Sequence, residues 1–121
     1  MMRTAYRSMV VLGMVVMGWG SSSMIYQAGA TGGDAAKGKA IYQAKCVTCH
    51  GAQGKGDGPL GTKLKPPAGD FTSAESKKKS EDELRNIIEN GVSKTAMVAW
   101  KKQLNETEIQ DVLAHVLTLR K

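Results

Sequence analysis

The sequence predicts an all-α domain of about three helices joined by long loops. Three segments carry apolar residues at helical spacing, and each follows a residue suited to helix capping, namely Asp34, Ser80 and Asn105. A stretch rich in glycine and proline separates the first two segments. No segment shows the apolar and polar alternation that is typical of half-buried strands. We therefore expect one helical domain over residues 31–121, preceded by a leader over residues 1–30.

The first predicted helix begins after Asp34, whose carboxylate can accept hydrogen bonds from the free backbone amides of the first turn. It continues through Tyr42 and Ala44 toward Cys46. A long loop then extends from residue 51 to residue 69, because turn-forming residues recur throughout this stretch. These residues are Gly51, Gly54, Gly56, Gly58, Pro59, Gly61, Pro66, Pro67 and Gly69.

Capping patterns also mark the second and third predicted helices. Ser80 and Glu83 form the S-x-x-E pattern of a capping box, and Gly91 ends this helix at the position of a left-handed C-cap. Asn105 with Glu108 begins the last helix. The apolar residues of the last helix repeat at i, i+3, i+4, i+7 and i+8, and they are Ile109, Val112, Leu113, Val116 and Leu117.

Residues 1–30 have the pattern of a signal peptide. Arg3 and Arg7 provide a short positive region, an apolar run extends over residues 9–19, and Ala28-Gly29-Ala30 has the small-x-small form of a cleavage site. The apolar run falls short of the roughly 20 residues that a membrane-spanning helix needs. We expect cleavage after Ala30 and export to the periplasm, with a retained membrane anchor as the alternative.

The pentapeptide Cys46-Val47-Thr48-Cys49-His50 has the attachment pattern of a c-type haem. Each thiol adds to one vinyl group of the porphyrin, and a single helical turn can offer both sulfurs. The adjacent His50 can then donate a ring nitrogen to the iron as proximal ligand. We therefore predict one covalently bound haem c at Cys46 and Cys49.

A C-x-x-C pair also occurs in zinc sites and in thioredoxin-like redox sites. A zinc site would need further cysteine or histidine nearby, but the chain has two cysteines in all, and its other histidine, His115, lies far downstream. A thioredoxin-like pair would need surrounding strands, which the sequence does not predict. After export, the two thiols would form a disulfide unless a haem or a reductase reacted with them.

The composition of the predicted mature domain suits a protein built around a cofactor. Its aromatic side chains of the Tyr, Phe and Trp types are Tyr42, Phe71 and Trp100 alone. A domain of this size has difficulty forming a sufficient core, and a large apolar cofactor can supply what is missing. We therefore expect the protein without haem to be largely unfolded.

The charge of the chain points to protein partners rather than nucleic acid. The formal net charge is +6, and all eleven acidic residues follow the leader, which contains Arg3 and Arg7. This positive charge is mild and diffuse and has few aromatic residues beside it, so it does not indicate nucleic-acid binding. It does favour electrostatic attraction to redox proteins with acidic docking surfaces.

Met97 is the candidate for the second axial ligand. It lies between the second and third predicted helices, and a neutral thioether paired with histidine raises the reduction potential of haem iron. The alternatives are a methionine that fills a gap in the core and an iron with five ligands. His115 lies in the middle of a helix, where we expect it to pack rather than to bind iron. The other methionines fall within the predicted leader: Met1, Met2, Met9, Met14, Met17 and Met24.

Taken in order, these motifs resemble a class I, monohaem c-type cytochrome over nearly all of the mature region, from Gly38 to Leu119. In that family a glycine and an aromatic residue precede the haem motif, as Gly38 and Tyr42 do here, and the missing side chain lets the last helix cross closely. The resemblance implies the class I cytochrome c fold. It also implies that His115, where members commonly have tyrosine or phenylalanine, makes a smaller contact with Tyr42 or a hydrogen bond to it.

Three further sites are implied by the same resemblance. The segment from Pro66 to Phe71 is similar to the Pro-Pro-x-x-Asp-Phe segment of many members, in which Phe71 would pack beside the haem. Met97 and Trp100 match the family's M-x-x-W pattern, which would place Trp100 close to the haem. The carbonyl of Pro59 would accept a hydrogen bond from Nδ1 of His50 and so leave Nε2 free for the iron.

An iron bound by both His50 and Met97 has no open position for a substrate, which favours an electron carrier over an enzyme. One alternative is a haem enzyme or gas sensor in which Met97 dissociates. Another is the cytochrome subunit of a dehydrogenase complex. Basic residues flank the predicted loops and can form either a docking ring for an acidic redox partner or an ordinary solvated surface: Lys63, Lys65, Lys77, Lys78 and Lys79.

Overall fold

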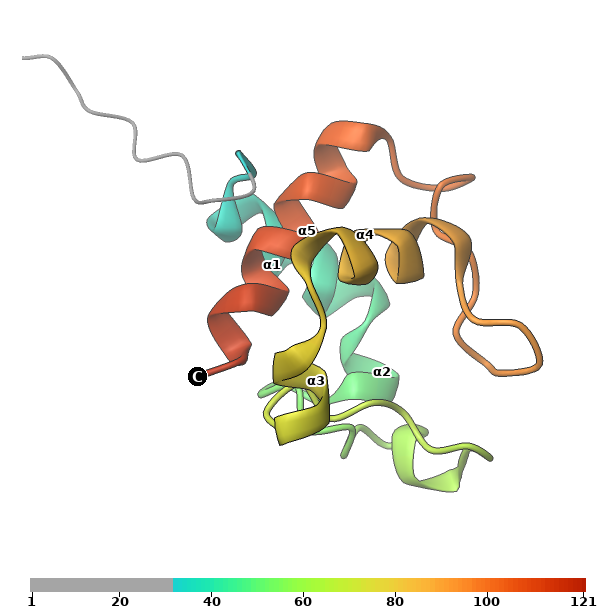
Figure 1. The fold of residues 1–121 in the computed structure, drawn as a ribbon. Helices are drawn as coiled ribbons and strands as arrows, with labels where there is room; N and C mark the ends of the chain where they lie inside the picture. Colours follow the sequence, from blue (N-terminus) through green and yellow to red (C-terminus); the bar gives the residue numbers. More distant parts are fainter. Residues whose placement is uncertain (1–31) are drawn as a thin grey trace, which may run out of the picture.

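The computed structural model describes residues 32–121, so the predicted signal peptide over residues 1–30 lies outside the described residues. The described part of the chain contains helices and loops and no strand (Figure 1). The elements are α1 (Ala35–Lys45), α2 (Val47–His50), the 3₁₀-helix η1 (Gly61–Lys63), α3 (Ala74–Lys78), α4 (Glu81–Asn90) and α5 (Glu106–Leu119). The all-α prediction is confirmed, and the three predicted helices correspond to α1, α4 and α5.

Each of the three long helices begins at the capping residue that the sequence indicates. The Asp34 carboxylate accepts hydrogen bonds from two backbone amides in the first turn of α1, at 2.9 and 3.2 Å. Ser80 and Glu83 form a complete capping box, with bonds of 3.1 and 2.6 Å, and Asn105 and Glu108 form another, with both bonds at 2.9 Å. These bonds satisfy amides that the helices leave without an intrahelical partner.

Two short helices and one cap differ from the prediction. α2 and α3 have four and five residues, too few to produce a recognisable apolar period in the sequence. Gly91 ends α4 with φ 69° and ψ −169°, which is a positive φ but not the left-handed helical conformation, so that part of the prediction was wrong. Its amide still donates to the carbonyl of Ile87, and its unusual φ turns the chain toward the next loop.

The close crossing of α1 and α5 organises the fold. Figure 1 shows α5 lying across α1, and the expectation for Gly38 is confirmed, because a Cβ there would overlap the backbone carbonyl of Asp111. Buried side chains from both helices and from the segment before α5 form the core around this crossing. They are Tyr42, Leu104, Ile109, Val112 and Val116.

Asp111 makes a second connection between α5 and α1 that the sequence analysis did not anticipate. Its side chain is 5% exposed and accepts a hydrogen bond of 2.7 Å from the backbone amide of Asp34. The carboxylate therefore lies at the N-terminus of α1, where a negative charge is favoured by the helix dipole. The two residues are 77 positions apart, so this bond joins the beginning and the end of the domain.

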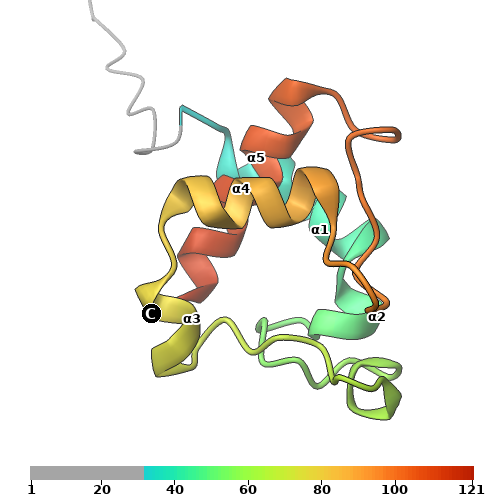
Figure 2. The same cartoon turned by 45° about the vertical axis from the view of Figure 1, so that its right-hand side comes forward.

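The remaining elements lie on two sides of the molecule. In Figure 2, α4 lies on one side and α2 with the long loop that follows lies on the other, while the segment after α4 runs from α4 down toward α2. Backbone hydrogen bonds fold this loop onto itself, from Phe71 to Gly54 at 2.7 Å and from Ala68 to Gly61 at 3.0 Å. The loop therefore has a defined course although it contains little regular structure.

Candidate functional site

A cavity of about 410 Å³ lies between the loop after α2 and the segment after α4. Its size falls within the range of about 300–1,000 Å³ that is usual for cofactor pockets. Its wall is mainly apolar, and helices α1, α2, α3, α4 and α5 all contribute to it. The aliphatic residues on this wall are Leu64, Leu84, Ile87, Ile88, Val92, Val98, Leu104, Val112 and Val116.

The predicted attachment residues lie together on this wall. Cys46 stands between α1 and α2, and its amide donates to the carbonyl of Tyr42 at 2.8 Å, while Cys49 lies within α2. Before haem attachment, burial, partly opposed by the charge of Lys45, raises the pKa of the Cys46 thiol to about 11. Cys46 and helix α2 thus present two sulfurs to one cavity.

His50 ends α2 and is held in a defined orientation. Its Nδ1 lies 3.1 Å from the carbonyl oxygen of Gly69, and its ring stacks on Phe71 with 4.7 Å between ring centres and 17° between planes. Because a carbonyl only accepts, Nδ1 carries the proton and Nε2 keeps its lone pair. Burial lowers the pKa of His50, and the bond to Gly69 opposes that effect in part. The neutral imidazole is therefore favoured.

The prediction that Pro59 accepts this hydrogen bond was wrong. Pro59 is exposed and does not line the cavity, and Gly69 is the acceptor. The physical reason is the hydrogen bond from Phe71 to Gly54, which draws the segment before Phe71 against the imidazole. A backbone acceptor leaves no residue-type signal, so Gly69 could not have been identified from the sequence alone.

Phe71 and Trp100 both lie on the cavity wall. Phe71 contacts Tyr42 as well as His50, with ring centres 6.5 Å apart. Trp100 is anchored by its backbone amide, which donates to the carbonyl of Ile88 at 3.0 Å, and the Lys45 ammonium lies 5.6 Å from its ring centre. The two aromatic residues that the resemblance singled out are thus placed at the candidate site, on different segments of the chain.

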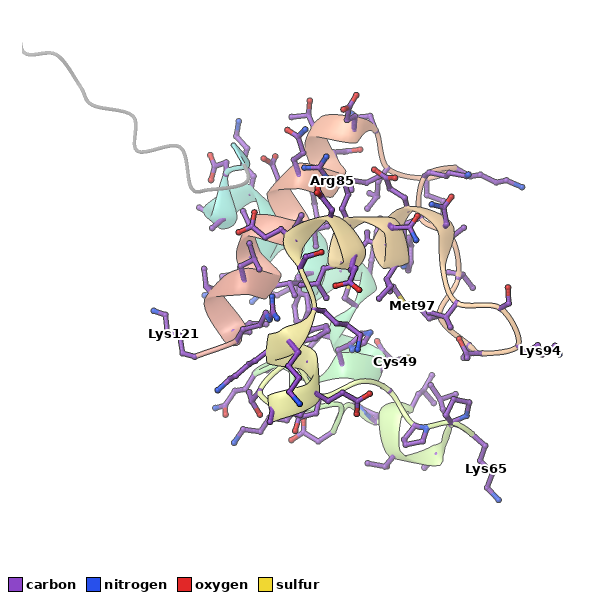
Figure 3. The ribbon with its side chains drawn as sticks, in the orientation of Figure 1. Cys49, Lys65, Arg85, Lys94, Met97 and Lys121 are labelled. Atoms are coloured by element: carbon purple, nitrogen blue, oxygen red, sulfur yellow. The ribbon has the colours of Figure 1, made fainter. Side chains whose placement is uncertain are left out.

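Met97 reaches the same cavity from the segment after α4. Figure 3 shows Met97 and Cys49 approaching from different elements. The Met97 amide donates to the Thr95 hydroxyl at 3.1 Å, and the Met97 carbonyl accepts from the Val92 amide at 3.0 Å. Gly91 packs against this loop, since a Cβ there would lie 2.5 Å from the Met97 carbonyl oxygen. Two hydrogen bonds and the close approach of Gly91 thus fix the backbone of Met97.

Arg120 is a further residue at the site that the sequence analysis missed. Its guanidinium donates to the carbonyls of Ser76 and Lys79, the latter at 2.9 Å, and both of these residues line the cavity. The end of α5 therefore holds α3 against the site. The only sequence signal was a basic residue near a helix C-terminus, which is also explained by the helix dipole.

His115 packs against Tyr42, with ring centres 5.0 Å apart in an edge-to-face arrangement. The Tyr42 hydroxyl donates to the Gly51 carbonyl at 2.6 Å, so the contact between the two rings is a packing contact rather than the hydrogen bond considered from the sequence. Burial raises the pKa of Tyr42, which keeps its hydroxyl protonated as a donor. His115 does not line the cavity.

Acidification below pH 6.5 is expected to destabilise the folded protein through His115. The side chain is 8% exposed, and burial, followed by the nearby Lys39 charge, lowers its pKa below the usual 6.5. The unfolded chain therefore binds a proton at a higher pH than the folded one, so the free energy of unfolding decreases as the pH falls through this range. His115→Phe should reduce the slope of that free energy against pH, measured by denaturant unfolding.

Measuring the slope just below pH 6.5 separates the contribution of His115 to the free energy of unfolding from that of the carboxylates. Hydrogen bonds from Ser80 lower the pKa of Glu83, so Glu83 titrates in more acidic solution. An unchanged slope in His115→Phe would contradict the prediction. A large change of the haem absorption spectrum in the same pH range, absent from the variant, would instead identify His115 as an iron ligand.

A helical domain with a C-x-x-C-H segment on the wall of an apolar cavity has the architecture of a c-type cytochrome. Comparison with protein families agrees, because residues 33–116 match the family described as cytochrome c oxidase, cbb3-type, subunit III. The chain belongs to this family of c-type cytochromes and carries covalently bound haem c.

Two solved structures are similar to the chain. A chain of the Kuenenia stuttgartiensis reducing HAO-like protein complex Kustc0457/Kustc0458 has a TM-score of 0.60 and 25% identity, covering 69% of this chain and 41% of that one. The KustC0563 c-type cytochrome has a TM-score of 0.54 and 30% identity, covering 69% of this chain and 93% of that one. The present chain thus spans less than half of the first and nearly all of the second.

A search of curated proteins finds no match to the chain.

Within residues 32–121, no helix combines the length and the apolar character needed to cross a membrane. Together, the family and the structural relatives support haem-based electron transfer as the function of this domain.

Proposed function

We propose that this protein is an exported one-electron carrier, whose haem is attached through Cys46 and Cys49 and ligated by His50 and Met97. The observation that carries the proposal is that His50 and Met97, from segments far apart in the sequence, line one apolar cavity with the two thiols. Bound haem would supply an iron that changes its charge by one electron.

The chain's own residues fit this role. The Gly69 carbonyl holds His50 in the tautomer whose Nε2 is free to bind a metal, and the hydrogen bonds of Met97 fix the loop that carries its thioether. An apolar wall around bound haem would limit the access of water, which would lower the rearrangement needed when the charge changes. An iron held by both His50 and Met97 would have no open position for oxygen or peroxide.

Export to the periplasm is the second part of the proposal. It is supported by the leader pattern, in which an apolar run precedes the small residues Ala28-Gly29-Ala30. The purified protein should then begin at Thr31, which mass spectrometry would check. A mass corresponding to the full chain with haem would show that the leader is retained.

Met97→Ala is expected to lower the reduction potential by on the order of 100 mV, because the thioether favours the reduced iron. A redox titration followed by absorption spectroscopy would measure the potential and the Met–iron charge-transfer band of the oxidised protein. Leu60→Ala is the matched control, since Leu60 is an apolar residue that is 49% exposed and does not line the cavity. An unchanged potential and an unchanged band in Met97→Ala would exclude Met97 as a ligand.

The same samples distinguish a carrier from a sensor or enzyme. The reduced wild-type protein should not bind carbon monoxide at neutral pH, whereas Met97→Ala should bind it at the vacated position. Binding by the wild type would mean that Met97 dissociates readily, which would favour the haem enzyme or gas-sensor alternative.

A second candidate function is that of a cytochrome subunit within a larger redox complex. It is favoured by the family description, which names a subunit of an oxidase, and by a structural relative that belongs to a protein complex. Isolation from the native source would test it, because a stable subunit would elute with its partner and a free carrier would elute alone.

A further inference from the structure

Asn90, the last residue of α4, is followed by the glycine that ends the helix. An asparagine loses its side-chain amide most easily before glycine, because glycine has no side chain to hinder attack by its own backbone nitrogen. Asn86 and Asn105, the other asparagines of the chain, precede isoleucine and glutamate. Asn90 is also exposed, so water can reach it. The end of α4 therefore offers a position for a spontaneous covalent change.

The fold needs a glycine at position 91. A Cβ there would lie 2.5 Å from the Met97 carbonyl oxygen and 2.8 Å from the Ala99 amide nitrogen, closer than real contacts allow. The positive φ of 69° also disfavours a side chain. Figure 2 shows the chain after α4 running from the end of this helix toward α2. The glycine that makes Asn90 reactive thus also packs against the loop of Met97.

The helical conformation holds Asn90 in an unreactive arrangement. The Gly91 amide donates to the Ile87 carbonyl at 2.8 Å, so its N–H points back along the helix rather than toward the Asn90 side chain. That side chain is held at both ends, since its Nδ2 donates to Asn86 Oδ1 and its Oδ1 accepts from the Lys101 ammonium, each at 2.7 Å. Attack on Asn90 requires these bonds to open, which happens most easily in the last turn of a helix.

Lys101 binds the end of α4 twice. Its amide donates to the Glu89 carbonyl at 3.2 Å, and its ammonium donates to the Asn90 carboxamide. The Trp100 amide also donates to the Ile88 carbonyl at 3.0 Å. Removal of the ammonium would therefore free the carboxamide of Asn90 while the two backbone bonds still hold the segment against α4.

We propose that Asn90 is a modification site, at which deamidation to isoaspartate releases the loop of Met97 and Lys101 slows the change. The Gly91 nitrogen bonds to Cγ of Asn90, and the side-chain nitrogen leaves as ammonia with the proton that the Gly91 nitrogen gives up. Water then opens the cyclic imide at the backbone carbonyl, which leaves isoaspartate with a free carboxylate.

Isoaspartate changes the path of the main chain. The backbone of residue 90 then runs through Cβ and Cγ, which lengthens it by one atom. Gly91 has no space for an added atom against Met97 and Ala99, so the contact with the loop is lost. The bond from the Val92 amide to the Met97 carbonyl, which depends on that contact, is weakened as well. The consequence for iron ligation rests on the proposed function of an electron carrier, whereas the chemistry at Asn90 does not.

The test follows the haem-containing protein during incubation in warm, mildly alkaline buffer. Peptide mass spectrometry measures conversion at residue 90, and an isoaspartyl methyltransferase identifies isoaspartate. Lys101→Met removes the ammonium and keeps the length of the side chain. Lys102→Met is the matched control, because it removes the adjacent exposed charge and leaves the bond to Asn90 in place. Asn90→Gln should stay unmodified, since its longer side chain forms a cyclic imide much more slowly.

Lys101→Met should convert about two- to fivefold faster than the wild type, the effect of losing one exposed hydrogen bond. Lys102→Met should convert at the wild-type rate. The Met–iron charge-transfer band should decrease in proportion to the isoaspartate formed. Asn90→Asp, which has the new negative charge without the longer main chain, should keep the band.

Absence of conversion in Lys101→Met, over a time in which the denatured chain converts, would exclude Asn90 as a modification site. A rate for Lys101→Met equal to or below that of the wild type would overturn the protective role of Lys101. An intact band in the isoaspartate form, or a lost band in Asn90→Asp, would overturn the release of Met97 by the longer main chain. A band missing from the unmodified protein would contradict ligation by Met97 and would leave the rates at Asn90 measurable.

Discussion

Replacing Gly38 with alanine is expected to destabilise the protein by about 3 kcal/mol or more. The added Cβ would overlap the backbone carbonyl of Asp111 and lie 2.9 Å from the Val112 amide nitrogen. Neither group can rotate away as a flexible side chain would, so α1 and α5 would have to separate. That separation would loosen the packing of Tyr42 and Val116, which belong to the central core.

The direction of this effect is informative because helix propensity alone predicts the opposite. Alanine is more favourable than glycine in a helix interior by about 1 kcal/mol, so Gly38→Ala would stabilise α1 if no other element were close. Denaturant unfolding followed by far-UV circular dichroism would measure the difference. Ala40→Gly is the matched control, since Ala40 is exposed on the same helix and the change there should cost only the helix propensity of about 1 kcal/mol. A Gly38→Ala protein as stable as the wild type would show that the two helices do not cross this closely.

Removing both attachment thiols, in Cys46→Ala/Cys49→Ala, is expected to abolish the cooperative fold and most of the helical signal. The cavity occupies the region between α2, α3, α4 and the long loop, and much of the apolar surface of these elements faces it. Without an apolar body in the cavity, that surface is exposed to water, and a domain this small has little other burial to offset the conformational entropy. The core at the crossing of α1 and α5 is too small to keep the other helices and the long loop folded without the cofactor.

Far-UV circular dichroism and thermal unfolding of the double variant would measure this loss. Cys49→Ala alone is the matched control, because it keeps Cys46 for a single covalent bond and should retain an intermediate helical signal. A double variant that has native helicity and unfolds cooperatively without haem would contradict the expectation, and it would show that the helices are stable around an empty cavity.

The long helices could be predicted from the sequence because their signals are local. Asp34, Ser80 and Asn105 each precede apolar residues at helical spacing, and the structure contains all three caps. The haem motif and Met97 were identifiable because the chemistry requires particular side chains at particular spacings. Gly38 was identifiable only through the family resemblance, since nothing in the local sequence shows which helix crosses it.

The rest of the site depends on backbone groups and on contacts between distant residues. Gly69 acts through a carbonyl that every residue possesses, which is why Pro59 was assigned in its place. Asp111 and Arg120 reach partners 77 and 41–44 positions away, and no periodic pattern encodes such pairs.

The hydrogen bond from the Asp34 amide to Asp111 also bears on when the domain can form. Because α1 packs mainly on α5, the first helix lacks its main packing partner until almost the whole sequence is present. Contacts between residues so distant in sequence form slowly, since a long loop must close before any of them contributes. A chain delivered from its N-terminus, by the ribosome or through a membrane channel, therefore stays open until its last helix arrives. During that interval the two cysteines remain accessible for haem attachment.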